Sequence, residues 1–318
     1  MIRQKGLALV LVLWVLSLLT IMAGSFALGM RREASIVAGI KNNAQAMAVA
    51  ESGIAMAEMM LLNTDQNKRW RADGSIYQIN SADAKVRIRL LSETGKIDIN
   101  KADQTLLQGL MTSAPVEEEQ QTRLVNAILD WRDKDDLVLI DGAEKKEYES
   151  AGLSYQPRNK PFQTIEELQL VLGMNAAVFS WIEPLVTVYS GQQQVTAQLA
   201  TREVLQVLPG LDTGQIDAYL AARLESAINN QPVPAFPSSS GQNNAAGENN
   251  VLTVVSEAVL DDESSAVISA VIKQSGGTGT TPFQVLKWQH VAANGASLFT
   301  DAMSELLVKQ YAESEFNN

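Results

Sequence analysis

The hydrophobic and polar positions begin with one long apolar segment. Residues Leu7–Gly29 form a run of 23 residues without a charge, preceded by Arg3 and Lys5 and followed by Arg31 and Arg32. A helix of this length covers the roughly 30 Å hydrocarbon core of a bilayer, whereas the apolar region of an ordinary signal peptide is shorter. The run therefore predicts a membrane-spanning helix. The two basic residues before it favour a cytoplasmic N-terminus, and the two after it act against that orientation.

The helical pattern continues beyond the membrane segment. Apolar residues fall three, four or seven positions apart at Ile36, Ile40, Met47, Ala50, Ile54, Ala57 and Leu61. This spacing describes one apolar stripe along a helix. One interpretation is a single helix over Leu7–Leu62, about 84 Å long, whose outer half lies against a sheet of its own domain. The alternative is an ordinary anchor followed by an unrelated soluble helix.

Other segments have the patterns of strands. They are Ser75–Ile79, Lys85–Leu91, Val251–Leu260, Ala266–Lys273 and Phe283–Val291. The second alternates apolar residues with arginines, which is typical of an antiparallel sheet with one wet face. The C-terminal segment Ser297–Tyr311 is predicted to form an amphipathic helix. The pattern indicates a small α+β domain whose sheet is divided in the sequence.

Between the two halves of the sheet, residues 100–230 are rich in Leu, Ala, Gln and Glu with helical periodicity. We predict a large all-helical domain inserted into the sheet domain. Residues 231–250 contain three prolines, a serine run and several asparagines, the composition of a flexible linker back to the sheet. Trp131 and Trp181 flank helical segments and are expected to fill the core of the insert.

The insert contains an internal repeat with a separation of 37 residues. Thr164, Glu166, Leu168, Gln169 and Gly173 recur as Thr201, Glu203, Leu205, Gln206 and Gly210. Each copy reads as helix, glycine turn, helix, and resembles the helix-hairpin-helix element of DNA-binding proteins, so the insert is expected to have a helix-hairpin-helix or SAM-like fold. Asn175 and Asp212 replace the second glycine, and an aspartate there would repel phosphate. We therefore expect two packing hairpins, with Asp212 or Thr213 as an N-cap, and no nucleic acid partner.

Composition restricts the chemistry that the chain can perform. Its 318 residues suffice for about two domains. The net charge of −11 disfavours binding to nucleic acid phosphates, which requires clustered Lys and Arg. The chain has no cysteine, hence neither disulfides nor thiol chemistry, and its single histidine, His290, is expected to be a packed or surface residue. No Gly-x-Ser-x-Gly turn accompanies that histidine.

One segment is rich in carboxylate side chains, which can bind metal ions. Residues Asp130–Glu149 hold eight carboxylates. Asp133, Asp135, Asp141 and Glu144 follow the oxygen-ligand spacing of an EF-hand, at positions 1, 3, 9 and 12. Leu137 and Val138 stand at positions 5 and 6, where a ligand and the turn glycine belong, so an EF-hand is excluded. A loop suited to a hard cation is still predicted, and the absence of histidine and cysteine argues against zinc.

The N-terminus and this loop together carry a family resemblance. Lys5-Gly6 directly before the apolar run resembles a prepilin peptidase site, with cleavage after Gly6 and Leu7 as the first mature residue. The fifth mature residue is glutamate in pilins, where it is thought to pair with the terminal amine of the preceding subunit. Here it is Leu11. This departure suits a subunit with none ahead of it, because an unpaired carboxylate in a bilayer is costly.

The later motifs make the resemblance more specific. Ile-Leu-Asp-Trp-Arg-Asp-x-Asp, Gly-Ala-Glu and Tyr-x-Pro-x-Asn-x-Pro-Phe follow one another in the order seen in K-class minor pseudopilins of the type II secretion system. That family has calcium in its helical domain, so the resemblance implies a structural calcium ion here. The candidate ligands are Asp130, Asp133, Asp135, Asp141, Glu144 and Asn159.

The resemblance also implies a function in assembly rather than catalysis. The chain would lie in the bacterial inner membrane, with its bulk periplasmic, and would start or cap the pseudopilus with the minor pseudopilins of the I and J classes. The expected divisions are a leader (1–6), a transmembrane helix (7–29), a pilin-like domain (30–99 and 251–318), the insert (100–230) and the linker (231–250). Prepilin peptidase and inner membrane lipid are further expected partners.

A second interpretation comes from a different functional class. A membrane-anchored periplasmic calcium-dependent hydrolase could use Asp130, Asp133 and Glu144 as acid and base. An N-methylated Leu7 would favour the pseudopilin, whereas an intact Met1 or cleavage near Ala27 would favour the enzyme.

Overall fold

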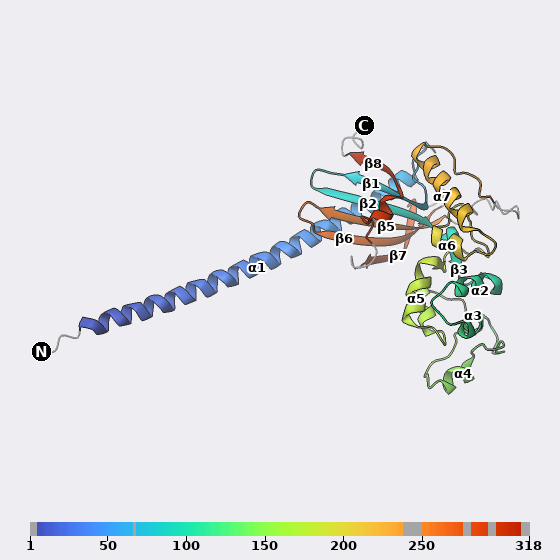
Figure 1. The fold of residues 1–318 in the computed structure, drawn as a ribbon, viewed down its shortest axis with the longest axis horizontal. Coiled ribbons are helices and arrows are strands. Elements are labelled where there is room, and N and C mark those ends of the chain that lie inside the picture. Colours follow the sequence, from blue (N-terminus) through green and yellow to red (C-terminus); the bar gives the residue numbers. More distant parts are fainter. Residues whose placement is uncertain (1–4, 66–67, 238–249, 276–280, 292–296, 313–318) are drawn as a thin grey trace.

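A computed structural model gives the fold, and it describes residues 5–65, 68–237, 250–275, 281–291 and 297–312. Most of the predicted linker and the last six residues lie outside this part. Figure 1 shows a long helix that projects from a body made of a sheet and a group of short helices. The short helices lie at the end of the molecule opposite the N-terminus. The predicted α+β class is confirmed.

Helix α1 (Lys5–Leu61) is continuous from the apolar run into the body, as predicted. Its last four turns are covered by the sheet, with Ala46, Ala50, Ile54 and Ala57 buried. Ile36 and Ile40, predicted to belong to the covered stripe, are exposed instead. The sheet begins to contact the helix only near Ala46, and an apolar period cannot indicate where the partner surface begins.

Glycine permits the closest approach of α1 to the sheet. A Cβ atom at Gly53 would lie 2.2 Å from Ser256 Oγ and 3.1 Å from Val86 Cγ1. The helix therefore rests directly on the sheet at this point, over strands β2, β5 and β6.

The main sheet has the strand order β7-β6-β5-β2-β1-β8. Its members are β1 (Asp73–Asn80), β2 (Ala84–Ser92), β5 (Val251–Leu260), β6 (Ser265–Gln274), β7 (Phe283–Val291) and β8 (Leu307–Ala312). Strands β1, β2, β5, β6 and β7 pair antiparallel with their neighbours, and the five predicted strand segments are confirmed. The sheet is not wholly antiparallel, because β8 pairs parallel with β1.

The prediction of a helix over Ser297–Tyr311 was wrong. Only α8 (Asp301–Ser304) is helical, with Thr300 as its N-cap, and the chain then enters strand β8. The free edge of β1 supplies the hydrogen-bond partners for this segment, so tertiary pairing overrides the local pattern. Buried Glu257 accepts a hydrogen bond from Ser297 Oγ at 2.9 Å and fixes the start of the segment on the sheet.

The insert leaves the sheet after β2 and returns at β5. It contains α2 (Gln104–Thr112), α3 (Glu118–Arg132), α4 (Lys145–Ser150), α5 (Ala176–Ile182), α6 (Arg202–Val207), α7 (Thr213–Ile228) and three 3₁₀ turns: η1 (Glu93–Gly95), η2 (Ile165–Leu170) and η3 (Glu183–Leu185). It is not all-helical, because β3 (Ile97–Asp98) and β4 (Val186–Thr187) form a small parallel ladder. This ladder pairs the start of the insert with the segment that follows η3.

The insert has its own hydrophobic core, separate from the core between α1 and the sheet. Trp131 is 1% exposed and stacks on Phe162, with ring centroids 6.0 Å apart, as expected of a core residue. Trp181 is only half-buried at the edge of this core. A core of this size indicates that the insert is a packed unit rather than a long loop.

Candidate functional sites

The loop between α3 and α4 is organised by one buried carboxylate. Asp130, in the last turn of α3, is fully buried and accepts hydrogen bonds from Ala143 N at 2.8 Å and from Leu139 N at 3.3 Å. A Cβ atom at Gly142 would lie 2.0 Å from Asp130 Oδ2, so only glycine fits there. The oxygens of Asp130, a predicted metal ligand, thus accept hydrogen bonds from the loop backbone and hold the loop closed.

Three other predicted ligands hold buried oxygens that make no hydrogen bond within the described chain. These are Asp133 Oδ1, Glu144 Oε1 and Asn159 Oδ1. Asn159 is held in place by its amide nitrogen, which donates to Asp135 O at 2.8 Å and to Asp136 Oδ1 at 2.7 Å. Because a buried polar atom without a partner is costly, this set of oxygens is suited to binding a cation.

The electrostatics of the loop also favour a bound cation. Burial, and secondly repulsion from Asp130, Asp133, Asp136 and Asp135, raises the pKa of Glu144 to about 7. Burial is also the leading cause of raised pKa values at Asp130 and Asp133. Ionised carboxylates are therefore destabilised here, and a divalent cation would reverse that effect.

The remaining predicted ligands lie at the surface of the same loop. Asp135 is exposed, and its Oδ1 accepts a hydrogen bond from Leu137 N at 2.9 Å. Asp141 is exposed and has a φ of 59°. Across the described ranges, no three Asp, Glu, His or Cys side chains form a complete metal-binding group. The structure thus singles out Asp133, Glu144 and Asn159 as oxygen donors, and water or backbone oxygens would have to complete a shell.

Sequence reasoning missed the part played by Asp136. Its carboxylate holds Asn159 across 23 positions of the chain. Nothing in the local pattern connects the two residues. Asn159 has a positive φ of 51°. Only the folded chain brings it next to Asp135 and Asp136.

The glycine turns of the internal repeat are capped by the side chains that replaced the second glycine. Asn175 Oδ1 accepts from Val178 N at 2.9 Å at the start of α5, and Asp212 Oδ2 accepts from Gly214 N at 2.9 Å at the start of α7. The predicted N-cap at Asp212 is confirmed. The amides that a phosphate would use are occupied by the protein's own side chains.

A buried carboxylate joins the insert to the sheet. Glu93 is 1% exposed and accepts hydrogen bonds from Lys96 at 2.7 Å, from Thr253 of β5 at 2.6 Å and from Thr187 of β4. Burial alone would raise its pKa, but Lys96 and the two hydroxyls hold the pKa of Glu93 below its ordinary value. The ionised carboxylate therefore fixes the small ladder of the insert to the main sheet.

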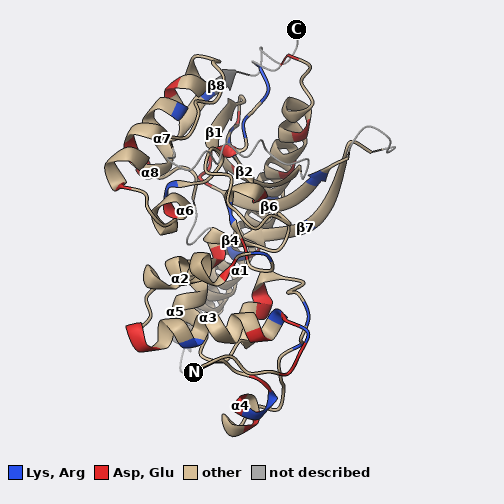
Figure 2. Ribbon diagram, turned by 90° about the vertical axis from the view of Figure 1, so that its right-hand side faces the viewer, with Lys and Arg blue, Asp and Glu red and all other residues tan. Residues whose placement is uncertain are grey.

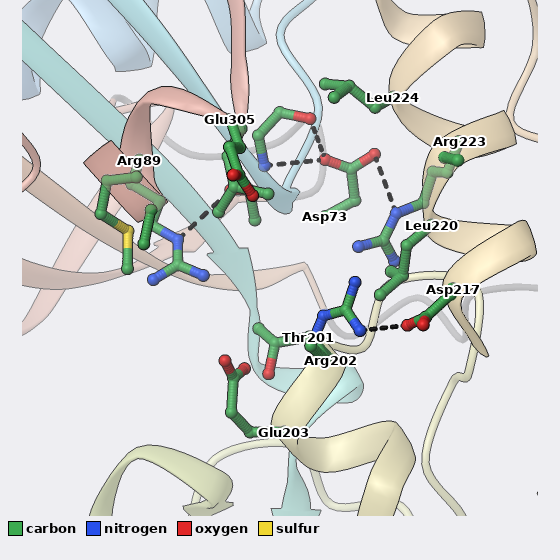
Figure 3. Close-up of a pocket in the computed structure, with 16 residues that line it drawn as sticks. Asp73, Arg89, Thr201, Arg202, Glu203, Asp217, Leu220, Arg223, Leu224 and Glu305 are labelled. Carbon is green, nitrogen blue, oxygen red and sulfur yellow. Dashed lines mark hydrogen bonds and ion pairs between the residues drawn. The ribbon is translucent and has the colours of Figure 1, made fainter. Parts of the chain in front are cut away.

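A second junction surrounds a cavity of about 390 Å³ (Figure 3). Asp73 of β1 faces Arg223 of α7 at 3.9 Å, and Arg202 pairs with Asp217 across the same cavity. Arg223 also donates to Ala200 O at 2.8 Å. Together with the Glu93 junction, the contact between Asp73 and Arg223 links the insert to the sheet.

Helix α1 provides the anchor. It is the one described helix long and apolar enough to cross a membrane, and its apolar window is not buried inside the protein. Leu11, the predicted fifth mature residue, is 63% exposed on its surface. The backbones of Gly6 and Leu7 lie in the first turn of α1, and the side chain of Leu7 lies outside the described part of the structure. His290 is exposed at the end of β7.

The sequence comparisons match this chain to proteins that share one description. Residues 78–191 match the family model described as type II secretion system (T2SS), protein K. Type II secretion system protein K of Klebsiella pneumoniae is 25% identical, over 58% of this chain and 62% of that protein. The protein of the same name from Aeromonas hydrophila is 27% identical, over 58% and 63%. The chain thus matches a little under two thirds of the length of these relatives.

The fold has a counterpart among solved structures. A chain of the GspK–GspI–GspJ complex from the type 2 secretion system of enterotoxigenic Escherichia coli superposes with a TM-score of 0.50 at 15% identity. The match covers 83% of this chain and 99% of that chain. At this identity the likeness concerns the fold, and it agrees with the resemblance derived from the sequence motifs.

Proposed function

We propose that this chain is a K-type minor pseudopilin of a type II secretion system and that it occupies the tip of the pseudopilus. The observation that carries the proposal is the continuous helix α1, which is apolar at its start and packs at its other end on the sheet that bears the bulky insert. Such a molecule has one end suited to a bilayer and to helix packing, and another end that can only terminate a stack.

The anchor supports a processed subunit. Prepilin peptidase would cut after Gly6 and leave Leu7 as an N-methylated terminus in the inner membrane, with the N-terminus cytoplasmic and the body periplasmic. Leu11 stands where a glutamate would bind the terminal amine of a subunit ahead. An apolar residue there removes the need for that amine, because an unpaired carboxylate in lipid is costly.

The position of the insert supports a place at the tip. In Figure 1 the short helices of the insert lie beyond the sheet, at the end of the body farthest from the apolar half of α1. A subunit stacked above would meet this bulk, whereas subunits below would meet α1 and the sheet. The expected neighbours below are minor pseudopilins of the I and J classes, in keeping with the complex in which the structural counterpart occurs.

A structural calcium ion in the loop between α3 and α4 belongs to the same proposal. Asp133, Glu144 and Asn159 would contribute the oxygens described above, and Asp135 and Asp141 lie on the same loop. Calcium prefers six to eight oxygen ligands and tolerates irregular geometry. When bound, it would neutralise the crowded carboxylates and fix the loop on α3. We assign it no catalytic task.

The alternative, a membrane-anchored periplasmic calcium-dependent hydrolase, is less well supported. Asp130, its candidate acid or base, is fully buried and engaged with the backbone of its own loop. A general acid or base must reach substrate. We therefore propose a protein of assembly and not an enzyme.

The two functions predict different mature N-termini. Intact mass and N-terminal fragment spectra of protein extracted from membranes should show an N-methylated Leu7, and a strain without prepilin peptidase should yield a chain that begins at Met1. An unmodified Met1 in the wild-type strain, or cleavage near Ala27, would reject the pseudopilin and favour the anchored or secreted enzyme.

A further inference from the structure

Four consecutive apolar residues are held in solvent at the outer end of the insert. Leu137, Val138, Leu139 and Ile140 have exposed fractions of 75%, 51%, 40% and 86%. They form the middle of the loop between α3 and α4, which we call the apolar loop run. Scattered exposed apolar residues are ordinary, but a contiguous exposed run marks an interaction site.

The apolar loop run is held in place by buried polar residues of α3. Asn126 is 5% exposed and donates from Nδ2 to Ile140 O at 2.7 Å, while Asp130 accepts from Leu139 N. Gly142 N closes the loop onto Leu139 O at 2.8 Å. Two buried side chains are thus used to fix the backbone of a run whose own side chains point outward. Such preorganisation lowers the entropy cost of binding.

A groove runs beside the apolar loop run. Its volume is about 700 Å³, and Val138 and Leu139 form one wall while Leu124 and Ala127 of α3 form part of another. Arg123, Asp141 and Glu147 supply its charged positions. The run and the groove together offer exposed apolar anchors next to a recess, the arrangement typical of the centre of an interface.

The charges around the run indicate the chemistry of the partner. Seven carboxylates and three lysines lie between residues 133 and 149, and Figure 2 shows acidic segments along this loop. A partner with basic side chains beside its apolar ones would match this surface. A second copy of the chain, which has a net charge of −11, would bring acidic side chains against acidic side chains and be repelled. The inner membrane that would hold α1 lies at the opposite end of the molecule (Figure 1).

We propose that the apolar loop run and its groove dock an extended segment of another protein that carries apolar side chains flanked by Lys or Arg. The site lies on the insert, at the end of the molecule opposite the start of α1 (Figure 1). Its loop backbone is fixed by Asn126 and Asp130, and the proposed calcium ion would fix the same loop further.

The test uses the purified full chain in detergent and four sets of fluorescent decapeptides: apolar with basic, apolar with acidic, apolar with neutral polar, and basic with neutral polar residues. Fluorescence anisotropy should show that the apolar and basic set binds at least about tenfold more tightly than the others. A Leu137→Ser/Ile140→Ser variant should lose at least about tenfold in that affinity, about 1.4 kcal/mol.

The control is Ile228→Ser, which removes an exposed apolar side chain from a different part of the insert, the end of α7. It should bind as the wild type does. Equal binding of all four sets, or unchanged binding by the double variant, would overturn the proposal. So would Leu137-dependent and Ile140-dependent binding to phosphatidylglycerol vesicles, which would indicate a lipid partner, or concentration-dependent self-association lost in the double variant.

Discussion

Replacing Glu144 by glutamine tests the proposed calcium loop most sharply. The carboxyl of Glu144 is 5% exposed, and burial together with four neighbouring aspartates raises its pKa from 4.5 to about 7. Below pH 4.5 the group is neutral in the folded and unfolded chains. As the pH rises from 4.5 through 7, the unfolded chain ionises first, so the folded state loses stability across this window.

The size of the effect follows from the pKa. The shift corresponds to about 3 kcal/mol of lost stability above pH 7 when no cation is bound. Glutamine cannot ionise and should remove most of this loss, although Asp130 and Asp133, whose pKa values are also raised, should leave a smaller pH dependence. Calcium requires the ionised carboxylate, so its affinity should increase from pH 5 to pH 8.

The assay is thermal unfolding of the detergent-solubilised chain, followed by circular dichroism at pH 5 and pH 8, in chelator and in calcium. In chelator, the wild type should be less stable at pH 8 than at pH 5, and Glu144→Gln should reduce this difference. At pH 8, calcium at a hundredfold excess over its Kd should stabilise the wild type by about 2.7 kcal/mol and the variant by much less.

Glu149→Gln is the control, because Glu149 lies on α4 with a side chain that is 63% exposed. If calcium leaves the wild-type Tm unchanged at pH 8, or if Glu149→Gln behaves as Glu144→Gln does, the reasoning about the loop is wrong.

Three further substitutions probe other parts of the account. Glu93→Gln removes the charge that faces buried Lys96 and should cost about 3 kcal/mol of unfolding free energy in denaturant titration; adding Lys96→Met should recover part of it, and no recovery would argue against the ion pair. Gly53→Ala places a Cβ 2.2 Å from Ser256 Oγ and should cost about 1–3 kcal/mol, whereas Gly39→Ala, which meets nothing within 4 Å, should be neutral or slightly stabilising; equal effects would contradict the close approach of α1 to the sheet. Gly142→Ala places a Cβ 2.0 Å from Asp130 Oδ2 and should weaken calcium binding in isothermal titration by at least about tenfold, while Gly152→Ala, in open space but at a φ of 76°, should affect stability and leave calcium affinity unchanged.

The elements with a strong local period were predictable from the sequence. The apolar stripe on α1 and the alternation in β2 each depend on residues close together in the chain, so they predicted the helix and the sheet. Strand β8 was not predictable, because its state is decided by the open edge of β1, more than two hundred residues earlier. The same holds for Ile36 and Ile40, whose exposure depends on where the sheet begins.

In the candidate site, too, the residue types were predictable from the sequence, whereas their individual roles depend on contacts made in the fold. Counting carboxylates found the loop and its donor types, including Asp133 and Glu144. It could not separate Asp130, whose oxygens bind the loop backbone, from residues with free oxygens, since that distinction depends on contacts with Leu139 and Ala143. Nor could it reveal that Leu137 and Val138, which excluded an EF-hand, are exposed to solvent in a loop held by α3.

The position of the chain within a filament tests the central claim most directly. The protein has no cysteine, so a Ser150→Cys variant, altered at an exposed site at the end of α4, can be labelled with maleimide gold, with the wild type as the unlabelled control. Electron microscopy of isolated pseudopili should show one gold particle at one end of each filament. Particles at regular intervals along the shaft would contradict a subunit that terminates the assembly.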